Sequence, residues 1–457
     1  MNSTTNERLS RRTKMFYGAG DFGFSMNNSI IGILFAIFLT DVVGLAPSLA
    51  AAAIFIGRSW DYINDPIIGN LSDRTRTRWG RRRPFLLFGL LPFALAFAAL
   101  WWRPPITQPV LLAGYYALAY LLYDAAATFV YMPYYALTPD LTQDYDDRTT
   151  LTSYRMVFNI LGGLVAFTLP LALIGVMRPE NAGRVSWMGF LFGLLAALPL
   201  LLTFFGTRER NEYQEQKQPG LLESLRAAFK NRPFLYAAGV FLFTWTALEI
   251  VQGMLLYFLK YRLHMENDSD LISGAVFIAA LAALPMWERL TRRWDKRKAY
   301  IAGMIYLSLM MVLLIAVQPG WGVNLVVVLA ALIGIGVGAM HVIPWAMIPD
   351  SIELDELETG QRHEGMFYSL VLTLRKISQS IALPSMLLIL DWNGFVSNAS
   401  VQTPAALNAI GILTGLVPVG LLVVGIIFAL LYPLSRERHS QLRDRLAKRH
   451  MLPTSTD

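Results

Sequence analysis

Two aspartates one helical turn apart, Asp61 and Asp65, lie within an otherwise apolar stretch at residues 50–71. A charged side chain at the centre of a bilayer costs about 2.5 to 3.5 kcal/mol on insertion scales, so such residues are usually retained where they act. At about 3.6 residues per turn, Arg58 shares one helix stripe with both aspartates, and Asn64 lies beside it. Carboxylate and amide oxygens are hard ligands for a small cation, and two carboxylates can also share a proton. The sequence therefore predicts a cation site. The alternative is a buried ion pair between Arg58 and one aspartate, which would leave the other carboxylate unpaired.

Other polar side chains fall inside apolar runs, and each has a structural and a functional interpretation. Asp21 lies in the first turns of its run, where a helix dipole favours an anion, so it is a candidate for an anchoring, gating or solute-binding role. Asp124 and Glu249 lie deeper, which favours solute binding or proton coupling. Tyr131 and Trp345 are candidates for stacking on a sugar face, although such residues also anchor helices at the membrane interface. The other polar side chains inside apolar runs are Asn27, Asn28, Gln252 and His341. Of these, Asn28 is a further candidate solute contact.

The composition places the chain in a membrane. Hydrophobic residues make up 55% of the 457 positions and charged residues only 16%. The mean hydropathy is +0.44, which is too apolar for an ordinary soluble domain. The N-terminus is polar and basic, and the first apolar run is too long for a signal-peptide core, so it is predicted to be a retained span. The chain has no cysteine, which excludes thiolate chemistry, and its five histidines have no paired spacing that would predict a metal centre.

Apolar runs long enough to cross a hydrocarbon core of about 30 Å recur twelve times. Basic residues cluster in the N-terminus, at 74–83, at 207–232, at 289–298 and after the last run, all on one side if twelve spans are correct. Because short cytoplasmic segments collect Lys and Arg, both termini are placed in the cytoplasm of a plasma or bacterial inner membrane. The net charge of +7 is thus explained by topology and contact with anionic lipid, and no nucleic-acid partner is predicted. The predicted spans are 16–42, 48–71, 84–101, 109–137, 152–176, 186–206, 234–261, 271–287, 299–317, 322–347, 366–390 and 405–433.

The two halves of the sequence resemble each other. The segment 133–140, which ends the fourth span with Pro-Tyr-Tyr-Ala-Leu-Thr-Pro-Asp, is echoed at 344–350 by Pro-Trp-Ala-Met-Ile-Pro-Asp at the end of the tenth. A duplicated six-span unit is typical of transporters that hold their site at the repeat interface. The predicted domains are a bundle at 1–206, a linker at 207–232 with an amphipathic helix at 221–231, a second bundle at 233–435 and a basic tail at 436–457.

The loop after the second run resembles the motif between spans 2 and 3 of the major facilitator superfamily. It reads Gly69-Asn-Leu-Ser-Asp73, followed by Gly80-Arg-Arg-Arg83. In that superfamily the aspartate pairs with arginines or a helix N-terminus, and breaking these pairs accompanies opening. The resemblance implies an all-α integral membrane fold with twelve transmembrane helices in two pseudo-symmetric six-helix bundles. It also implies gating roles, with a fixed anchor as the structural alternative, for Gly69, Asp73, Arg81 and Arg82.

Further motifs are similar to those of the glycoside, pentoside and hexuronide cation symporters, over nearly the whole chain. They are Tyr17-Gly-Ala-Gly-Asp-Phe-Gly23, Asp41-Val-Val-Gly-Leu45, the segment 58–69, the segment 144–149, Ser153-Tyr-Arg155 and Arg362-His-Glu-Gly365. The resemblance implies a sodium site made by Asp61, Asn64, Asp65 and Thr128, with coupling roles for Arg58 and Lys376. Asp61 and Asp65 would be metal ligands only if the coupling ion is Na⁺.

The implied solute site departs from the family pattern. Ser25 and Tyr131 stand where family members carry carboxylates that hold sugar hydroxyls, whereas the arginine of the fifth span is kept as Arg155. A hydroxyl and a phenol bind sugars less strongly than carboxylates do. Sugar recognition in the usual manner is therefore in doubt.

The sequence predicts a cation-coupled secondary symporter that moves a sugar or glycoside-type solute by alternating access. The lysophospholipid symporters also resemble this family, so a lysophospholipid or other amphiphile is the alternative cargo. A polytopic membrane enzyme is less favoured, because the longest linker is short and basic and lacks room for an active-site domain. A nontransporting sensor is the third option, which solute flux in proteoliposomes would exclude. No glycine-rich phosphate loop is present, and no cofactor is predicted beyond Na⁺ or H⁺ as coupling ion. We expect a monomer.

Overall fold

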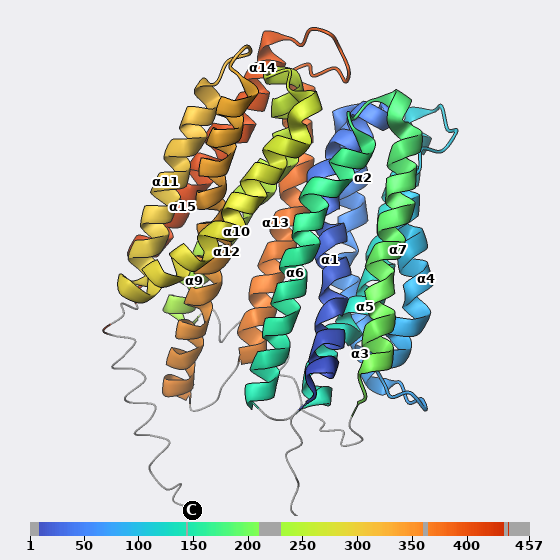
Figure 1. The fold of residues 1–457 in the computed structure, drawn as a ribbon, viewed down its shortest axis with the longest axis vertical. Helices are drawn as coiled ribbons and strands as arrows, with labels where there is room; N and C mark the ends of the chain where they lie inside the picture. The colour runs from blue at the N-terminus through green and yellow to red at the C-terminus, as the bar shows by residue number, and fades with distance from the viewer. Residues whose placement is uncertain (1–8, 143–144, 210–229, 360–363, 434–436, 438–457) are drawn as a thin grey trace, which may run out of the picture. The chain divides into compact units, whose positions relative to one another are not determined.

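The computed structural model describes residues 9–142, 145–209, 230–359, 364–433 and 437. These residues are almost entirely helical and contain no β-strand, and one isolated bridge joins Thr77 to Gly80 (Figure 1). The predicted all-α membrane fold is confirmed, whereas the helix predicted at 221–231 and most of the tail at 436–457 lie outside the described residues. The chain divides into two compact units: one holds Met1–Glu215, Glu266–Asp270 and Leu383–Ala406, and the other holds the remainder. The domain limits predicted from the sequence stay predictions.

The first unit is built around α1, which packs against α6 and α7, while α5 packs against α2, α3 and α4. α1 begins after Ser10, whose hydroxyl accepts a hydrogen bond from the Thr13 N–H at 3.1 Å and so caps the helix. α4 and α5 each begin with a proline in the first turn, where a missing N–H costs nothing. The helices are α1 (Arg11–Ile37), η1 (Phe38–Val43), α2 (Pro47–Ser59), α3 (Asp61–Arg74), α4 (Arg83–Leu100), α5 (Pro109–Leu141), α6 (Tyr145–Ile174), η2 (Pro179–Asn181) and α7 (Ala182–Gly206).

Glycines allow α1 to approach its two neighbours closely. A Cβ atom on Gly162 would lie 2.3 Å from the carbonyl oxygen of Phe22, and one on Gly23 would lie 2.2 Å from that of Ala196. Both distances are far below van der Waals contact, so these crossings require a residue without a side chain.

The second unit repeats the packing order of the first. α9 packs against α12 and α15, and α11 packs against the same two helices. In the first unit α1 and α4 likewise both contact α5 and α7. This recurrence agrees with the duplication seen in the sequence. The helices that lie mainly in this unit are α9 (Arg232–Tyr257), η3 (Phe258–Arg262), α10 (Ser269–Arg293), α11 (Lys296–Ala316), α12 (Val323–Thr359), α13 (Glu364–Trp392), α14 (Pro404–Gly411), η5 (Ile412–Leu416) and α15 (Val417–Leu431), and η4 (Glu266–Asp268) precedes α10.

Within the described residues, ten helical segments are long and apolar enough to cross a membrane. The α2–α3 pair and α13 occupy the other two predicted spans, and both carry charged candidate site residues. Large apolar side chains such as Phe88, Trp187 and Phe205 are exposed, as expected for surfaces that face lipid rather than water. Several boundaries differ from prediction, and the largest differences are in α6, which begins at Tyr145 rather than 152, and α12, which ends at Thr359 rather than 347. Hydropathy marks the apolar span alone, whereas a helix can continue through polar residues beyond it.

Candidate functional site

The second span is two helices joined at Trp60, and the break lies beside the predicted cation site. α2 ends at Ser59 and α3 begins at Asp61. The Ser59 hydroxyl donates to the Phe55 carbonyl at 2.6 Å, a contact that often bends helices. The helical backbone hydrogen bonds resume where the Asn64 N–H donates to the Trp60 carbonyl at 3.0 Å. The break therefore separates Arg58, on the last turn of α2, from the acidic first turns of α3.

Oxygen-bearing side chains from α3 and α5 meet a little further along the chain from this break. The Thr128 hydroxyl on α5 donates to Oδ1 of Asp65 at 3.3 Å. Asn64 is 6% exposed, and its Nδ2 has no hydrogen-bond partner among the described residues. The side chain of Asp61 lies outside the described part of the chain. The structure thus brings together Asp65 and Thr128, two of the four residues that the resemblance assigns to a sodium site, and Asn64 directly precedes Asp65 on α3.

The side of α5 that carries Thr128 contacts the second span at one more point. Nε of Arg58 donates to the Tyr120 hydroxyl at 2.7 Å, and the guanidinium lies 5.8 Å from the centre of the same ring. Tyr120 and Thr128 are about two helical turns apart, with Asp124 one turn from each. Asp124 therefore lies level with the middle of the second span, and its predicted role in solute binding or proton coupling stays a prediction. Tyr120 contacts Arg58, the candidate coupling residue, and was itself not identified from the sequence.

Asp21 and Arg155, predicted separately as solute contacts, form one buried ion pair. Nε of Arg155 lies 3.3 Å from Oδ2 of Asp21, and the Tyr135 hydroxyl donates to Oδ1 at 3.1 Å. The guanidinium lies 4.4 Å from the centre of the Tyr135 ring. The Asp21 side chain is only 1% exposed, whereas that of Arg155 is 17% exposed. In this conformation Asp21 neutralises and orients Arg155, which is the more exposed member of the pair.

The other candidate solute residues of the first unit lie deeper along α1 and α5. Tyr131 is almost fully buried with its ring 4.4 Å from that of Phe24, and its hydroxyl has no hydrogen-bond partner among the described residues. Asn27 is fully buried, and neither of its amide atoms has such a partner. Ser25 and Asn28 are half-buried on α1. Tyr131 and Asn27 therefore offer buried neutral groups that can both donate and accept.

Three candidate residues belong to the second unit. The Glu249 carboxylate on α9 accepts a hydrogen bond from the Gln379 amide on α13. The Trp345 ring lies 4.8 Å from that of Phe241 in an edge-to-face contact. Lys376 is half-buried on α13. The predicted coupling role of Lys376 stays a prediction.

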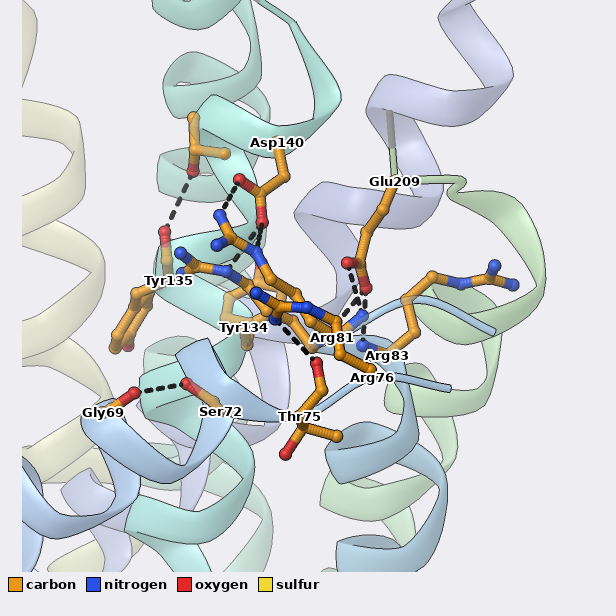
Figure 2. A network of polar contacts seen from close by, with 12 residues as sticks. Gly69, Ser72, Thr75, Arg76, Arg81, Arg83, Tyr134, Tyr135, Asp140 and Glu209 are labelled. Atoms are coloured by element: carbon orange, nitrogen blue, oxygen red, sulfur yellow. Dashed lines mark hydrogen bonds and ion pairs between the residues drawn. The ribbon is translucent and has the colours of Figure 1, made fainter. Parts of the chain in front are cut away.

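The loop between α3 and α4 is held by one aspartate at the end of α5. Arg81 donates to Asp140 from Nε at 3.2 Å and from Nη2 at 2.7 Å, and Nε of Arg82 lies 2.6 Å from Oδ2 of the same carboxylate. Figure 2 shows this clamp, in which Arg81 reaches from the loop to Asp140. The three side chains are between 9% and 13% exposed. Two other gating residues were predicted. The Gly69 carbonyl accepts a hydrogen bond from the Ser72 hydroxyl, and the side chain of Asp73 lies outside the described residues.

A second acid, Glu209, caps the N-terminus of α4. Its carboxylate accepts hydrogen bonds from three backbone N–H groups, those of Arg81 at 2.7 Å and of Arg82 and Arg83 at 2.9 Å each (Figure 2). These are donors that no residue of the helix can satisfy, and a carboxylate there also complements the helix dipole. The sequence analysis did not identify Glu209, because it follows α7 and lies far from this loop in the chain.

Substituting Glu209 by glutamine should weaken this cap. Gln keeps one acceptor oxygen but loses the charge, so we expect a destabilisation of about 0.5 to 2 kcal/mol. The measurement is the apparent unfolding midpoint of the purified protein in detergent at a fixed heating rate. Glu288→Gln is the matched control, because the Glu288 carboxylate is exposed and pairs with Arg292 one turn along its own helix. Equal midpoints for the two variants would contradict the capping role.

The second unit carries a simpler version of the same anchor. Nζ of Lys296, the first residue of α11, lies 2.6 Å from Asp350 and donates to the Ala346 carbonyl at 2.8 Å. Asp350 and Asp140 end the duplicated segments found in the sequence. The pair in the second unit is weaker, because one lysine replaces two arginines and is 33% exposed.

Comparison with known proteins supports the fold and the class of activity. A family model described as MFS/sugar transport protein matches residues 16–436. An uncharacterised symporter of Synechocystis is 33% identical to the chain, with 98% of each sequence covered. The sodium-dependent lysophosphatidylcholine symporter 1-A of Danio rerio is 28% identical over 93% of this chain and 86% of its own length. The crystal structure of a D-xylose-proton symporter aligns with a TM-score of 0.64 over 92% of this chain and 96% of that one, at 15% identity, which shows a shared fold.

Proposed function

Because the chain belongs to the MFS/sugar transport protein family, we propose that it is a symporter in which Na⁺ drives the movement of a small organic solute. Membership makes the protein a multi-pass membrane transporter and not an enzyme. The observation that carries the choice of ion is the 3.3 Å contact between Asp65 and Thr128, which unites a carboxylate and a hydroxyl from two helices beside Asn64. The name of the Danio rerio relative, a sodium-dependent symporter, supports the same ion.

The proposed cation site would join α3 to α5. Na⁺ prefers oxygen ligands, and the Thr128 hydroxyl, which now donates to Asp65, would turn its lone pairs to the ion. Asp61 and Asn64 would complete the ligand set from the first turns of α3. Bound cation would remove the repulsion between the two carboxylates and tighten α3 against α5. If this raises the affinity for solute, solute must raise the affinity for cation by the same factor.

The anchors at the ends of α5 and α12 would act as the gate. The Asp140 pairs with Arg81 and Arg82 would hold one end of the first unit in its present arrangement and would break during alternating access. We place this end, and both chain termini, on the cytoplasmic side, where the basic loops are predicted to lie. We further propose that a single chain is sufficient for transport.

For the solute we propose a sugar or glycoside. The unpartnered Tyr131 hydroxyl and Asn27 amide support this choice, because each can both donate to and accept from a sugar hydroxyl. Within each unit one aromatic face, that of Tyr131 or that of Trp345, would provide a stacking surface. A lysophospholipid is the second candidate, and it is favoured by the 28% identity to a lysophosphatidylcholine symporter.

Counterflow in proteoliposomes tests both the ion and the cargo. Purified protein would be reconstituted and loaded with one member of a panel of methyl glycosides, pentosides, hexuronides and lysophosphatidylcholine. We expect uptake of labelled solute to depend on Na⁺ at constant pH and to be little changed by a proton gradient at constant Na⁺. Uptake that depends on pH alone would show that the coupling ion is H⁺ rather than Na⁺. The absence of counterflow for every solute would refute the proposed cargo.

A further inference from the structure

The loop between α3 and α4 presents a tryptophan and an arginine that take no part in the proposed cation site or gate. A turn from Thr77 to Gly80 places Arg78 and Trp79 at its corners. The Gly80 N–H donates to the Thr77 carbonyl at 3.1 Å, and Gly80 has a φ of +106°, which favours glycine. The Arg78 guanidinium lies 4.5 Å from the centre of the Trp79 ring, within the range of a cation–π contact. The turn therefore holds a cation against the face of an indole ring.

Trp79 packs against two membrane-spanning helices. Its ring centre lies 6.0 Å from that of Phe88 on α4 and 6.1 Å from that of Phe204 on α7, and these two helices pack against each other. Arg83 fixes this arrangement, because its guanidinium donates to the Trp79 carbonyl at 3.3 Å and to the Phe204 carbonyl at 2.6 Å and 3.0 Å. Trp79 is therefore held at one end of the α4 and α7 pair.

Both helices carry exposed apolar faces that reach Trp79 or its neighbours. The side chains of each face are three and four residues apart, so they lie on one side of their helix. They are Phe88, Leu91 and Leu95 on α4, and Leu198, Leu202 and Phe205 on α7. In a multi-pass membrane protein such faces contact acyl chains, and a tryptophan at their end is typical of the headgroup level.

The positive charges around this tryptophan form no ion pairs. Arg74, at the end of α3, and Arg78 are exposed, and neither pairs with an acid among the described residues. Arg208, which follows α7, is also exposed and has no ion pair within the same part of the chain. Two acids of this region, Asp140 and Glu209, already bind the arginines and backbone N–H groups of the loop. The surface thus combines uncompensated positive charge with an apolar face.

We propose that this surface binds an anionic glycerophospholipid from the leaflet that faces the basic loops. The phosphodiester would accept hydrogen bonds from Arg78, whose guanidinium has no acceptor among the described residues. Arg74 and Arg208 would favour a headgroup with net negative charge, and the acyl chains would lie along the exposed faces of α4 and α7. The lipid would be a bound partner and not cargo, so the proposal is independent of the proposed ion and solute.

The corresponding basic segment of the second unit lacks these features. Arg292 lies 2.6 Å from Glu288, which neutralises it. Trp294 is 53% exposed and has no ring contact with any described residue. We therefore expect a lipid site at only one of the two duplicated segments, and the second segment provides matched controls.

Lipid binding by the purified full chain tests the proposal without requiring transport. Dioleoyl phosphatidylglycerol, dioleoyl phosphatidylcholine and the headgroup glycerophosphoglycerol would be titrated in detergent, with thermal stabilisation as the readout. We expect phosphatidylglycerol to bind about 10-fold more tightly than phosphatidylcholine, because nearby arginines favour net negative charge. The headgroup alone should give no shift over the same concentrations. Equal shifts with the two lipids, or an equal shift with the headgroup alone, would overturn the proposal.

Variants then separate a built site from the general attraction of basic loops to anionic lipid. Arg78→Gln should weaken phosphatidylglycerol binding by about 10-fold, as expected for loss of hydrogen bonds to a charged group. Trp79→Leu should weaken it similarly, and Trp79→Phe, which keeps a ring, should retain part of the binding and serves if Trp79→Leu does not fold. Arg292→Gln and Trp294→Leu should leave the binding unchanged. Equal losses in Arg78→Gln and Arg292→Gln, or no loss in Arg78→Gln, would overturn the proposal.

Discussion

Replacing Asp65 with asparagine is expected to lower the apparent affinity for Na⁺ by about 100-fold or more and to abolish sodium-stimulated transport. A metal site loses about 10-fold to 100-fold when a supporting residue is changed, and loss of a charged ligand should cost at least as much. Thr128→Val removes a neutral oxygen, so we expect a smaller loss of about 10-fold. The measurement is the Na⁺ concentration that half-saturates counterflow, with the amount of inserted protein determined in parallel.

The expected order of effects separates a ligand set from a general disturbance. Asp61→Asn should resemble Asp65→Asn, because the sequence places both carboxylates on one stripe of the helix. Glu288→Gln serves as the control, since Glu288 is an exposed acid that pairs within its own helix. Unchanged sodium dependence in both aspartate variants would refute the site, whereas loss of inserted protein would indicate a role in folding.

Asp140→Asn is expected to release the loop between α3 and α4 and to destabilise the first unit by about 3 kcal/mol or more. Removing one partner of a buried ion pair leaves the other charge uncompensated, which typically costs about 3 to 5 kcal/mol. Here two guanidinium groups, those of Arg81 and Arg82, would lose the same carboxylate. The measurement is again the apparent unfolding midpoint at a fixed heating rate.

The counterpart in the second unit provides a control for Asp140→Asn. Asp350→Asn should have a smaller effect, because Lys296 is 33% exposed and water can solvate its charge. Since the natural chain has no cysteine, a single reporter cysteine at Ser72 or Thr75 can be labelled without background. In Asp140→Asn we expect faster labelling at Ser72, which is buried near the end of α3, and at Thr75, which directly follows that helix. Equal labelling rates and equal midpoints for the two variants would show that Asp140 does not hold the loop.

The sequence by itself determined the membrane class, the approximate position of the spans and the residues that could bind a cation. Hydropathy and the distribution of Lys and Arg are local properties, so they can be read without knowing which helices touch. The same holds for Arg58, Asp61 and Asp65, whose common stripe follows from helical periodicity alone. Local patterns did not predict the break at Trp60, which follows the residue whose hydroxyl donates to the Phe55 carbonyl, Ser59.

Only the tertiary structure decided which charged groups are partners. Asp21 with Arg155, Asp140 with Arg81, and Glu209 with the start of α4 join residues that are far apart in the chain. The sequence showed these residues as separate polar positions, and some were interpreted as solute contacts. Whether a buried charge is an open ligand or one half of an ion pair depends on the side chain that the packing of neighbouring helices places beside it, and helical periodicity carries no information about that neighbour.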